Sequence, residues 1–141
     1  MTRPLRVLHL EDNPRDAASI RDRLEADGVV CDIRLTKDRA GFESALAQET
    51  FDLIISDFNL RGYDGISALK EVLASQPDVP VILVSGTVSE EEAVRCLQIG
   101  ATDYLIKSRL ERLAPAVERA IQEAETRLVR KRAEAALLQS E

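Results

Sequence analysis

Residues 52–57 read DLIISD, and within them the stretch Asp52–Ser56 is predicted to form a strand. An apolar run without alternation is typical of a strand that is buried on both faces of a parallel sheet. The run VILV at residues 81–84 has the same character, and LRVLHL at residues 5–10 reads as a further strand. Weaker strand patterns occupy residues 29–35 and 103–106.

A helical pattern follows each predicted strand. Asn13 and Pro14 supply an N-cap and a first-turn proline, and Ser89 with Glu92 fits a capping box. Helical patterns occupy residues 14–27, 39–49, 66–73, 89–100 and a final stretch from about residue 110 to the end. Strands that alternate with helices predict an α/β fold, a doubly wound parallel sheet with helices on both faces.

Composition limits the possible partners. The 141 residues are enough for one domain, with 45% hydrophobic and 31% charged residues and a net charge of -6. This negative charge argues against nucleic acid or an anionic membrane as a direct partner. No apolar run approaches the roughly 20 residues that cross a bilayer, and no secretory signal is evident. Cys31 and Cys96 suggest no disulfide framework, so we expect reduced thiols in a cytoplasmic protein.

The last part of the chain has a different pattern. Residues 116–141 contain no glycine or proline, and apolar residues recur at alternating steps of four and three. The first three turns fit a helix folded back on the domain. Beyond about Arg127 little domain surface remains, which favours pairing with a second copy over a solitary helix. This apolar seam consists of Val117, Ile121, Ala124, Leu128, Lys131, Ala135 and Leu138, with Lys131 as its polar interruption.

Polar side chains follow four of the predicted strands. Glu11 and Asp12 follow the first strand, Asp57 the third, Ser85 the fourth and Lys107 the fifth. Because ligands of a doubly wound sheet bind beyond the carboxyl ends of its strands, these residues are expected to converge. Each has an ordinary explanation on its own, but three clustered carboxylates repel one another unless a cation joins them. Oxygen donors suit Mg²⁺, so the sequence predicts a site for Mg²⁺ and an anion.

With these residues in place, the chain resembles the receiver domain of two-component response regulators over residues 4–122. The motifs that carry the resemblance are Glu11-Asp12, DLIISD ending in Asp57, the turn Gly62-Tyr63-Asp64-Gly65, VILVSG at 81–86 and GATDYLIK at 100–107. The resemblance implies a flavodoxin-like five-stranded sheet of order 2-1-3-4-5, one of the two common orders of doubly wound sheets. It divides the chain into a receiver domain, residues 1–122, and a helical extension, residues 123–141.

The resemblance implies that Asp57 accepts a phosphoryl group from a histidine kinase or a histidine phosphotransfer protein. Carboxylates are competent nucleophiles toward phosphorus. Glu11, Asp12 and Asp57 would hold Mg²⁺, with the backbone carbonyl of Asn59 as a further ligand. Such a protein catalyses only its own phosphorylation and dephosphorylation and is not a classical enzyme.

The resemblance also implies how the bound phosphate is recognised and read out. The Ser85 hydroxyl, the Gly86 backbone N–H and the Lys107 ammonium would bind it. Movement of Ser85 would let Tyr104 turn inward. This changes the face made by the fourth helix, the fifth strand and the fifth helix.

Several positions depart from the family pattern. Arg61 and Ser108 stand where prolines are usual, and because a non-proline cis bond is unfavourable we expect a trans bond between Lys107 and Ser108. Asn59 and Thr87 occupy positions that affect phosphate lifetime in the family. His9, inside the first strand, is expected to be packed rather than reactive.

Two other functions fit the sequence less well. A phosphatase with an aspartyl nucleophile usually has a second Asp two residues after the first, where this chain has Asn59. A receiver-like dimerisation or docking module that is not phosphorylated usually lacks a carboxylate or the lysine, and both are present here. The helical extension favours a homodimer and a connection to a downstream sensor or kinase module over a DNA-binding segment; a single-domain protein is the alternative.

Overall fold

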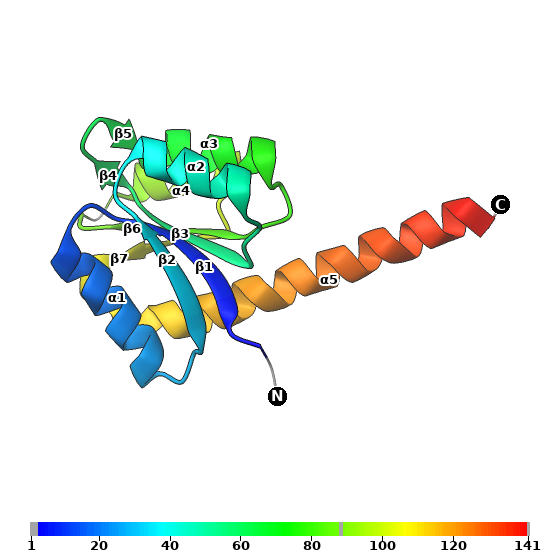
Figure 1. Cartoon of the computed structure of the whole chain (residues 1–141), viewed down its shortest axis with the longest axis horizontal. Coiled ribbons are helices and arrows are strands. Elements are labelled where there is room, and N and C mark those ends of the chain that lie inside the picture. Colours follow the sequence, from blue (N-terminus) through cyan, green and yellow to red (C-terminus); the bar gives the residue numbers. More distant parts are fainter. Residues whose placement is uncertain (1–2, 88, 141) are drawn as a thin grey trace.

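The computed structural model describes residues 3–87 and 89–140 and contains a five-stranded parallel sheet (Figure 1). Its order is β2-β1-β3-β6-β7, which confirms the predicted flavodoxin-like order 2-1-3-4-5. All side chains of β3 and β6 are buried, as their apolar runs predict. The strands are β1 (Leu5–Leu10), β2 (Cys31–Thr36), β3 (Leu53–Asp57), β6 (Val81–Ser85) and β7 (Asp103–Ile106).

Helices cover both faces of this sheet. Figure 1 shows α2, α3 and α4 on one side of it and α1 and α5 on the other. Two hydrophobic clusters correspond to these two layers, one containing Phe42, Leu69 and Cys96 and the other Ile20 and Val117. The helices are α1 (Pro14–Ala26), α2 (Arg39–Gln48), α3 (Gly65–Ser75), α4 (Glu90–Ile99) and α5 (Leu113–Ser140).

The helix starts follow the predicted capping chemistry. The Asn13 side chain accepts hydrogen bonds from the backbone N–H groups of Arg15 and Asp16, and Pro14 opens α1. The serine half of the predicted capping box is present, since Ser89 accepts a hydrogen bond from the N–H of Glu92 at the start of α4. These caps fix where the segment after β1 turns into α1, directly beside the carboxyl edge of the sheet.

The register of the sheet aligns the strand ends. Leu10 of β1 pairs with Ser56 of β3, so that the residues that follow, Glu11 and Asp57, lie on neighbouring strands. Strands β6 and β7 pair in parallel on the other side of β3. The carboxyl ends of the four strands therefore meet at one edge.

Two connections differ from the predicted ones. The predicted turn at residues 61–65 is part of a small antiparallel hairpin of β4 (Asn59–Leu60) and β5 (Tyr63–Asp64), with Gly62 at a φ of 73°. The last helix begins at Leu113 rather than near Leu110, because a 3₁₀ segment, η1 (Lys107–Arg112), comes first. Strand β2 also lies one to two residues later than predicted.

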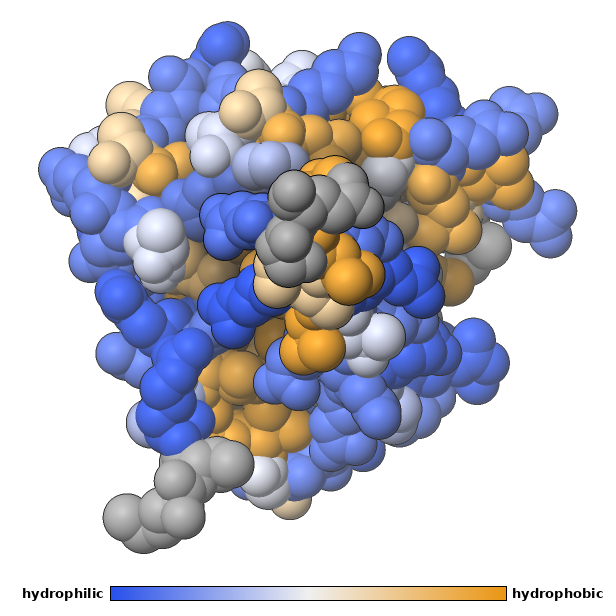
Figure 2. Space-filling model, turned by 90° about the vertical axis from the view of Figure 1, so that its right-hand side faces the viewer, coloured by the Kyte–Doolittle hydropathy of each residue, from blue (hydrophilic) through white to orange (hydrophobic). Residues whose placement is uncertain are grey.

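Helix α5 leaves the domain part-way along its length. Its residues are mostly buried or half-buried on one face up to Ala124, and from residue 125 onward the described residues are exposed. This agrees with the expectation that the domain covers only the first turns. Figure 2, which looks toward the C-terminal end of α5, shows hydrophobic surface beside that helix. Residue 141, the last of the predicted extension, lies outside the described residues.

The remaining general expectations have clear outcomes. Cys31 is half-buried and Cys96 buried, and both are free thiols whose pKa is raised by burial. Within residues 3–87 and 89–140 no peptide bond is cis, so the bond between Lys107 and Ser108 is trans as expected. In the same ranges, no helix combines the length and the apolar character needed to cross a membrane.

Candidate functional site

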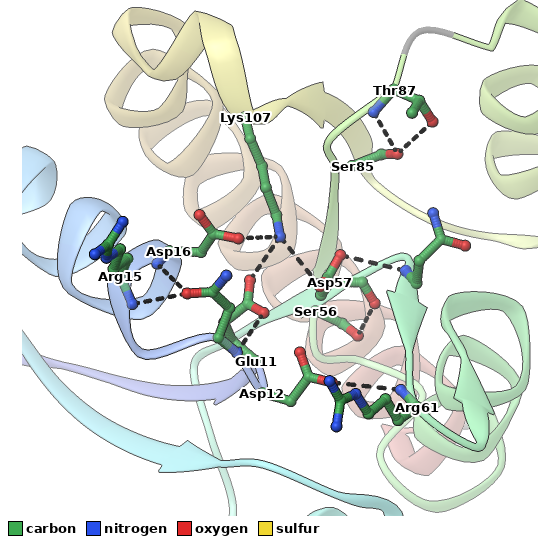
Figure 3. A network of polar contacts seen from close by, with 12 residues as sticks. Glu11, Asp12, Arg15, Asp16, Ser56, Asp57, Arg61, Ser85, Thr87 and Lys107 are labelled. Atoms are coloured by element: carbon green, nitrogen blue, oxygen red, sulfur yellow. Dashed lines mark hydrogen bonds and ion pairs between the residues drawn. The ribbon is translucent and has the colours of Figure 1, made fainter.

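Three carboxylates meet at the carboxyl edge of the sheet (Figure 3). Glu11 and Asp12 follow β1 and Asp57 ends β3, and one oxygen of each lies within 4.8 Å of the others. Glu11 and Asp57 are buried, and Asp12 is half-buried. The predicted convergence of these three residues is therefore present, with two of the three carboxylates buried.

The ammonium group of Lys107 reaches into this cluster from the end of β7. Its Nζ lies 2.9 Å from an oxygen of Glu11, 3.1 Å from Oδ2 of Asp57 and 2.7 Å from Oδ2 of Asp16 (Figure 3). Asp16 was not predicted as a site residue. An acidic residue in the first turn of a helix is commonly explained by the helix dipole, and sequence alone does not place α1 against η1.

The electrostatics of the cluster follow from burial. Burial, assisted by the charge of Asp57, raises the pKa of Glu11 to about 7, although Lys107 and the N–H of Asn13 act in the opposite direction. Burial lowers the pKa of Lys107, but its hydrogen bonds to Asp16, Glu11 and Asp57 outweigh this and the net change is upward. Burial thus disfavours the charged form of Glu11, whereas the three surrounding carboxylates favour the charged form of Lys107.

His9 lies in β1, two residues before Glu11, and is packed as predicted. Its side chain is buried, and its Nε2 has no hydrogen-bond partner among the described residues. Burial, and then the positive charge of Lys107, lower the pKa of His9 to about 4. The imidazole is therefore neutral at pH 7 and acts as part of the core.

Backbone N–H groups support the carboxylates. Asn59 donates to Oδ1 of Asp57 at 3.2 Å, and Asn13 donates to Oε2 of Glu11 at 3.1 Å. The N–H of Arg61 lies 3.4 Å from Oδ2 of Asp12.

A hollow of about 660 Å³ opens beside Asp12, lined by Asp12, Asn13, Pro14, Arg15 and Arg61. The site is thus accessible from solvent.

Ser85 ends β6 on the other side of Asp57. Its side chain is fully buried, and its Oγ accepts a hydrogen bond from the N–H of Thr87 at 3.3 Å and lies 3.4 Å from the Thr87 hydroxyl (Figure 3). Gly86, between them, is exposed and has open space where a side chain would begin. The Ser85 hydroxyl and the exposed Gly86 backbone therefore lie next to each other at the carboxyl end of β6.

Tyr104 links β7 to α4. Its half-buried side chain donates a hydrogen bond of 3.3 Å to Glu92, and its ring packs edge-on against Phe58, the residue after Asp57. Burial, together with the negative charge of Glu92, raises the pKa of Tyr104. The predicted switch residue thus contacts both the segment after Asp57 and the helix that follows Ser85.

Comparisons with known proteins agree on one family. A profile of the response regulator receiver domain matches residues 7–118. Transcriptional regulatory protein FixJ of Bradyrhizobium diazoefficiens is 34% identical over 113 residues, 78% of this chain and 55% of FixJ. The DNA-binding transcriptional regulator NtrC of Escherichia coli is 36% identical over 109 residues, 75% of this chain and 23% of NtrC. The receiver domain of the Francisella response regulator 1452 superposes with a TM-score of 0.74 at 27% identity, covering 84% of this chain and 98% of that one.

The matched residues run from within β1 to beyond β7 and include the three carboxylates of the cluster. The chain spans about half the length of FixJ and about a quarter of NtrC, whereas it covers nearly all of the solved receiver domain. On the strength of the family match and the matching strand order, the chain belongs to the response regulator receiver domain family.

Proposed function

We propose that this chain is the phosphoryl-accepting switch of a two-component phosphorelay and that Asp57 is the acceptor. One observation carries the proposal: the buried carboxylate of Asp57 lies 3.1 Å from the Lys107 ammonium, among two further carboxylates that can share a cation. A carboxylate in this setting can attack phosphorus while a cation beside it binds the incoming phosphoryl oxygens.

The donor set fits Mg²⁺. Glu11, Asp12 and Asp57 offer only oxygen ligands, which suit a hard divalent cation, and one oxygen of each lies within 4.8 Å of the others. These three residues would hold the ion together with the backbone carbonyl of Asn59. When bound, Mg²⁺ supplies positive charge that offsets the carboxylates and the phosphoryl oxygens.

The reaction uses groups of this chain in distinct roles. An oxygen of Asp57 forms the new bond to phosphorus while the bond from phosphorus to the donor, such as a phosphohistidine nitrogen, breaks. Lys107 binds a phosphoryl oxygen and remains protonated. The Ser85 hydroxyl and the Gly86 N–H donate hydrogen bonds to the product.

Phosphorylation then changes the surface. To reach the phosphoryl group, Ser85 gives up its contacts with Thr87, which draws the segment before α4 toward Asp57. Tyr104, hydrogen-bonded to Glu92 of α4, follows this displacement inward. The face formed by α4, β7 and α5 is the surface that a partner reads.

The proposed partners follow from the family. Receiver domains receive their phosphoryl groups from histidine kinases or phosphotransfer proteins, and we assign this chain the same class of donor in the cytoplasm. The relatives FixJ and NtrC are transcriptional regulators, but the chain matches only part of the length of each. For this chain we propose that α5 forms a homodimer and leads toward a downstream module.

The test is incubation with acetyl phosphate and Mg²⁺, followed by the mass of the intact protein. We expect a gain of one phosphoryl group that is absent in Asp57→Asn and unchanged in Asp22→Asn, an exposed residue of α1. If the folded wild-type protein gains no mass, the proposal is wrong, and a docking module without phosphorylation becomes the better interpretation.

A further inference from the structure

Asp16 makes the shortest of the three contacts of Lys107, 2.7 Å between Oδ2 and Nζ. It differs from Glu11 and Asp57, the other two partners, because it lies outside the group of carboxylates that can share a cation. It also comes from α1, whereas the other two follow strands of the sheet.

The Lys107 ammonium has as many N–H donors as it has carboxylate partners. An ammonium group has three N–H donors, and three carboxylates surround Lys107. A phosphoryl oxygen on Asp57 can be bound only when one of these contacts is released. Because Glu11 and Asp57 also serve the cation cluster, Asp16 is the partner that can remain throughout the reaction.

The backbone of Asp16 is well placed for this task. Its N–H donates to the Asn13 side chain, and it lies in the first turn of α1, which Pro14 opens. Lys107, in contrast, is carried on a flexible four-carbon chain and is followed by Ser108 and a 3₁₀ segment with an irregular backbone at Arg109. The helical backbone that carries Asp16 is thus more regular than the backbone that follows Lys107.

The geometry points to Asp16 as a positioning residue that holds Lys107 beside Asp57 for the transfer of the phosphoryl group. This inference rests on the proposed function. The opposite effect is a specific alternative, in which Asp16 competes with the phosphoryl group for Lys107 and its charge repels an anionic donor. Positioning predicts slower phosphorylation when Asp16 is removed, and competition predicts faster phosphorylation.

Two substitutions separate these effects. Asp16→Asn keeps an oxygen that can accept from Nζ but removes the charge, whereas Asp16→Ala removes both. We expect the rate of phosphorylation by acetyl phosphate to fall about tenfold in Asp16→Ala, the effect of losing one hydrogen bond to a charged group, and to stay near the wild-type rate in Asp16→Asn. Asp22→Ala on the same helix is the control. An Asp16→Ala rate equal to or above that of the wild type overturns the inference.

A double-mutant cycle shows whether Asp16 acts through the lysine. In a Lys107→Ala background, adding Asp16→Ala is expected to change the slow phosphorylation rate less than twofold. The free energy of unfolding of the same four proteins, measured without Mg²⁺, is expected to be non-additive as well. A full tenfold loss in the Lys107→Ala background, or additive unfolding free energies, contradicts the inference while the proposed function stands. A wild-type protein that takes up no phosphoryl group overturns both.

Discussion

Glu11 shows how far a single residue can be forced from its ordinary state by its position. Its side chain is 1% exposed, and it lies between Lys107, which favours its charged form, and Asp57, which opposes it. Burial dominates, and the pKa is raised to about 7. In the absence of a cation, an ionised Glu11 therefore destabilises the fold, although the same ionised group suits a metal site.

The first prediction concerns this residue. Below about pH 4.5 Glu11 is neutral in both the folded and the unfolded chain; as pH rises toward 7 only the unfolded chain releases the proton, so the free energy of unfolding falls. The Glu11→Gln variant has no titratable carboxyl at this position, so its free energy of unfolding does not fall for this reason. Without Mg²⁺ at about pH 8 we expect the variant to be more stable than the wild type by about 1–3 kcal/mol. The difference is expected to vanish near pH 4.5.

Urea unfolding across this pH range measures the difference directly. A Glu11→Gln protein that is less stable than the wild type by the same amount at both ends of the range would show that burial does not control this carboxyl. Asp32→Asn, a change to an exposed acid on β2, should show no such dependence on pH.

At the scale of elements, the sequence predicts most of what positions the site. The apolar runs of β1, β3 and β6 specify buried parallel strands, and their ends place Glu11, Asp57 and Ser85 at one edge. The caps of α1 and α4 are also predicted correctly, because Asn13 and Ser89 are residues whose side chains accept from backbone N–H groups. The local sequence is sufficient to predict an element that has a long apolar run or an N-cap residue at its start.

The elements that the sequence did not predict are short or depend on tertiary packing. Strands β4 and β5 have two residues each, too few for a period to be recognised, and the neighbouring Gly62 and Gly65 indicated only a turn. The segment η1 lies between β7 and α5, and its sequence was not distinguished from the helical pattern of α5 that follows it. The contact between Asp16 and Lys107 joins residues 91 positions apart, and it requires the packing of α1 against η1, which no local pattern encodes.

The second prediction concerns Gly65, the first residue of α3, directly after the hairpin of β4 and β5. Gly65 donates a hydrogen bond to the Phe58 carbonyl at 2.8 Å, and a Cβ at Gly65 would lie 2.9 Å from Phe58 Cα. Gly65→Ala therefore forces the backbone after Asp57 to shift, and we expect a loss of about 1–3 kcal/mol in the free energy of unfolding. Chemical denaturation is the measurement. Gly86→Ala, where a Cβ meets open space, is the control for stability alone, and equal stabilities of the two variants would contradict the close approach.

At the scale of the whole molecule, α5 connects the two ends of the sheet. It begins just after Lys107 and η1 at the site, and Figure 1 shows it running past the opposite end of the domain. Arg119 pairs with Asp103 of β7, and Lys131 pairs with Asp78 at 2.5 Å, so ion pairs join the helix to the domain at two points. The first ion pair joins α5 to β7, and the second joins it to the segment between α3 and β6.

The exposed part of α5 has little stabilisation of its own. From residue 125 onward its described residues are exposed, and isolated helices of about this length are marginal in water. Leu128 and Leu138, both members of the apolar seam, are exposed by 38% and 74%. Pairing of two seams would bury these side chains and stabilise the helix, whereas Lys131 at the seam would weaken the pair.

The last prediction tests this pairing by sedimentation. We expect the full chain to sediment as a dimer and a chain ended at Glu123 to sediment as a monomer, because the shortened chain lacks Leu128 and Leu138. Lys131→Leu is expected to lower the dimer dissociation constant about tenfold, since it replaces a charge at the seam by an apolar side chain. Arg130→Leu, at an outer position of the same helix, is the matched control and should leave the constant unchanged. Equal monomer masses for the full and the shortened chain would end the proposal of a dimer through α5, and the ion pair between Lys131 and Asp78 would then hold the helix against its own domain.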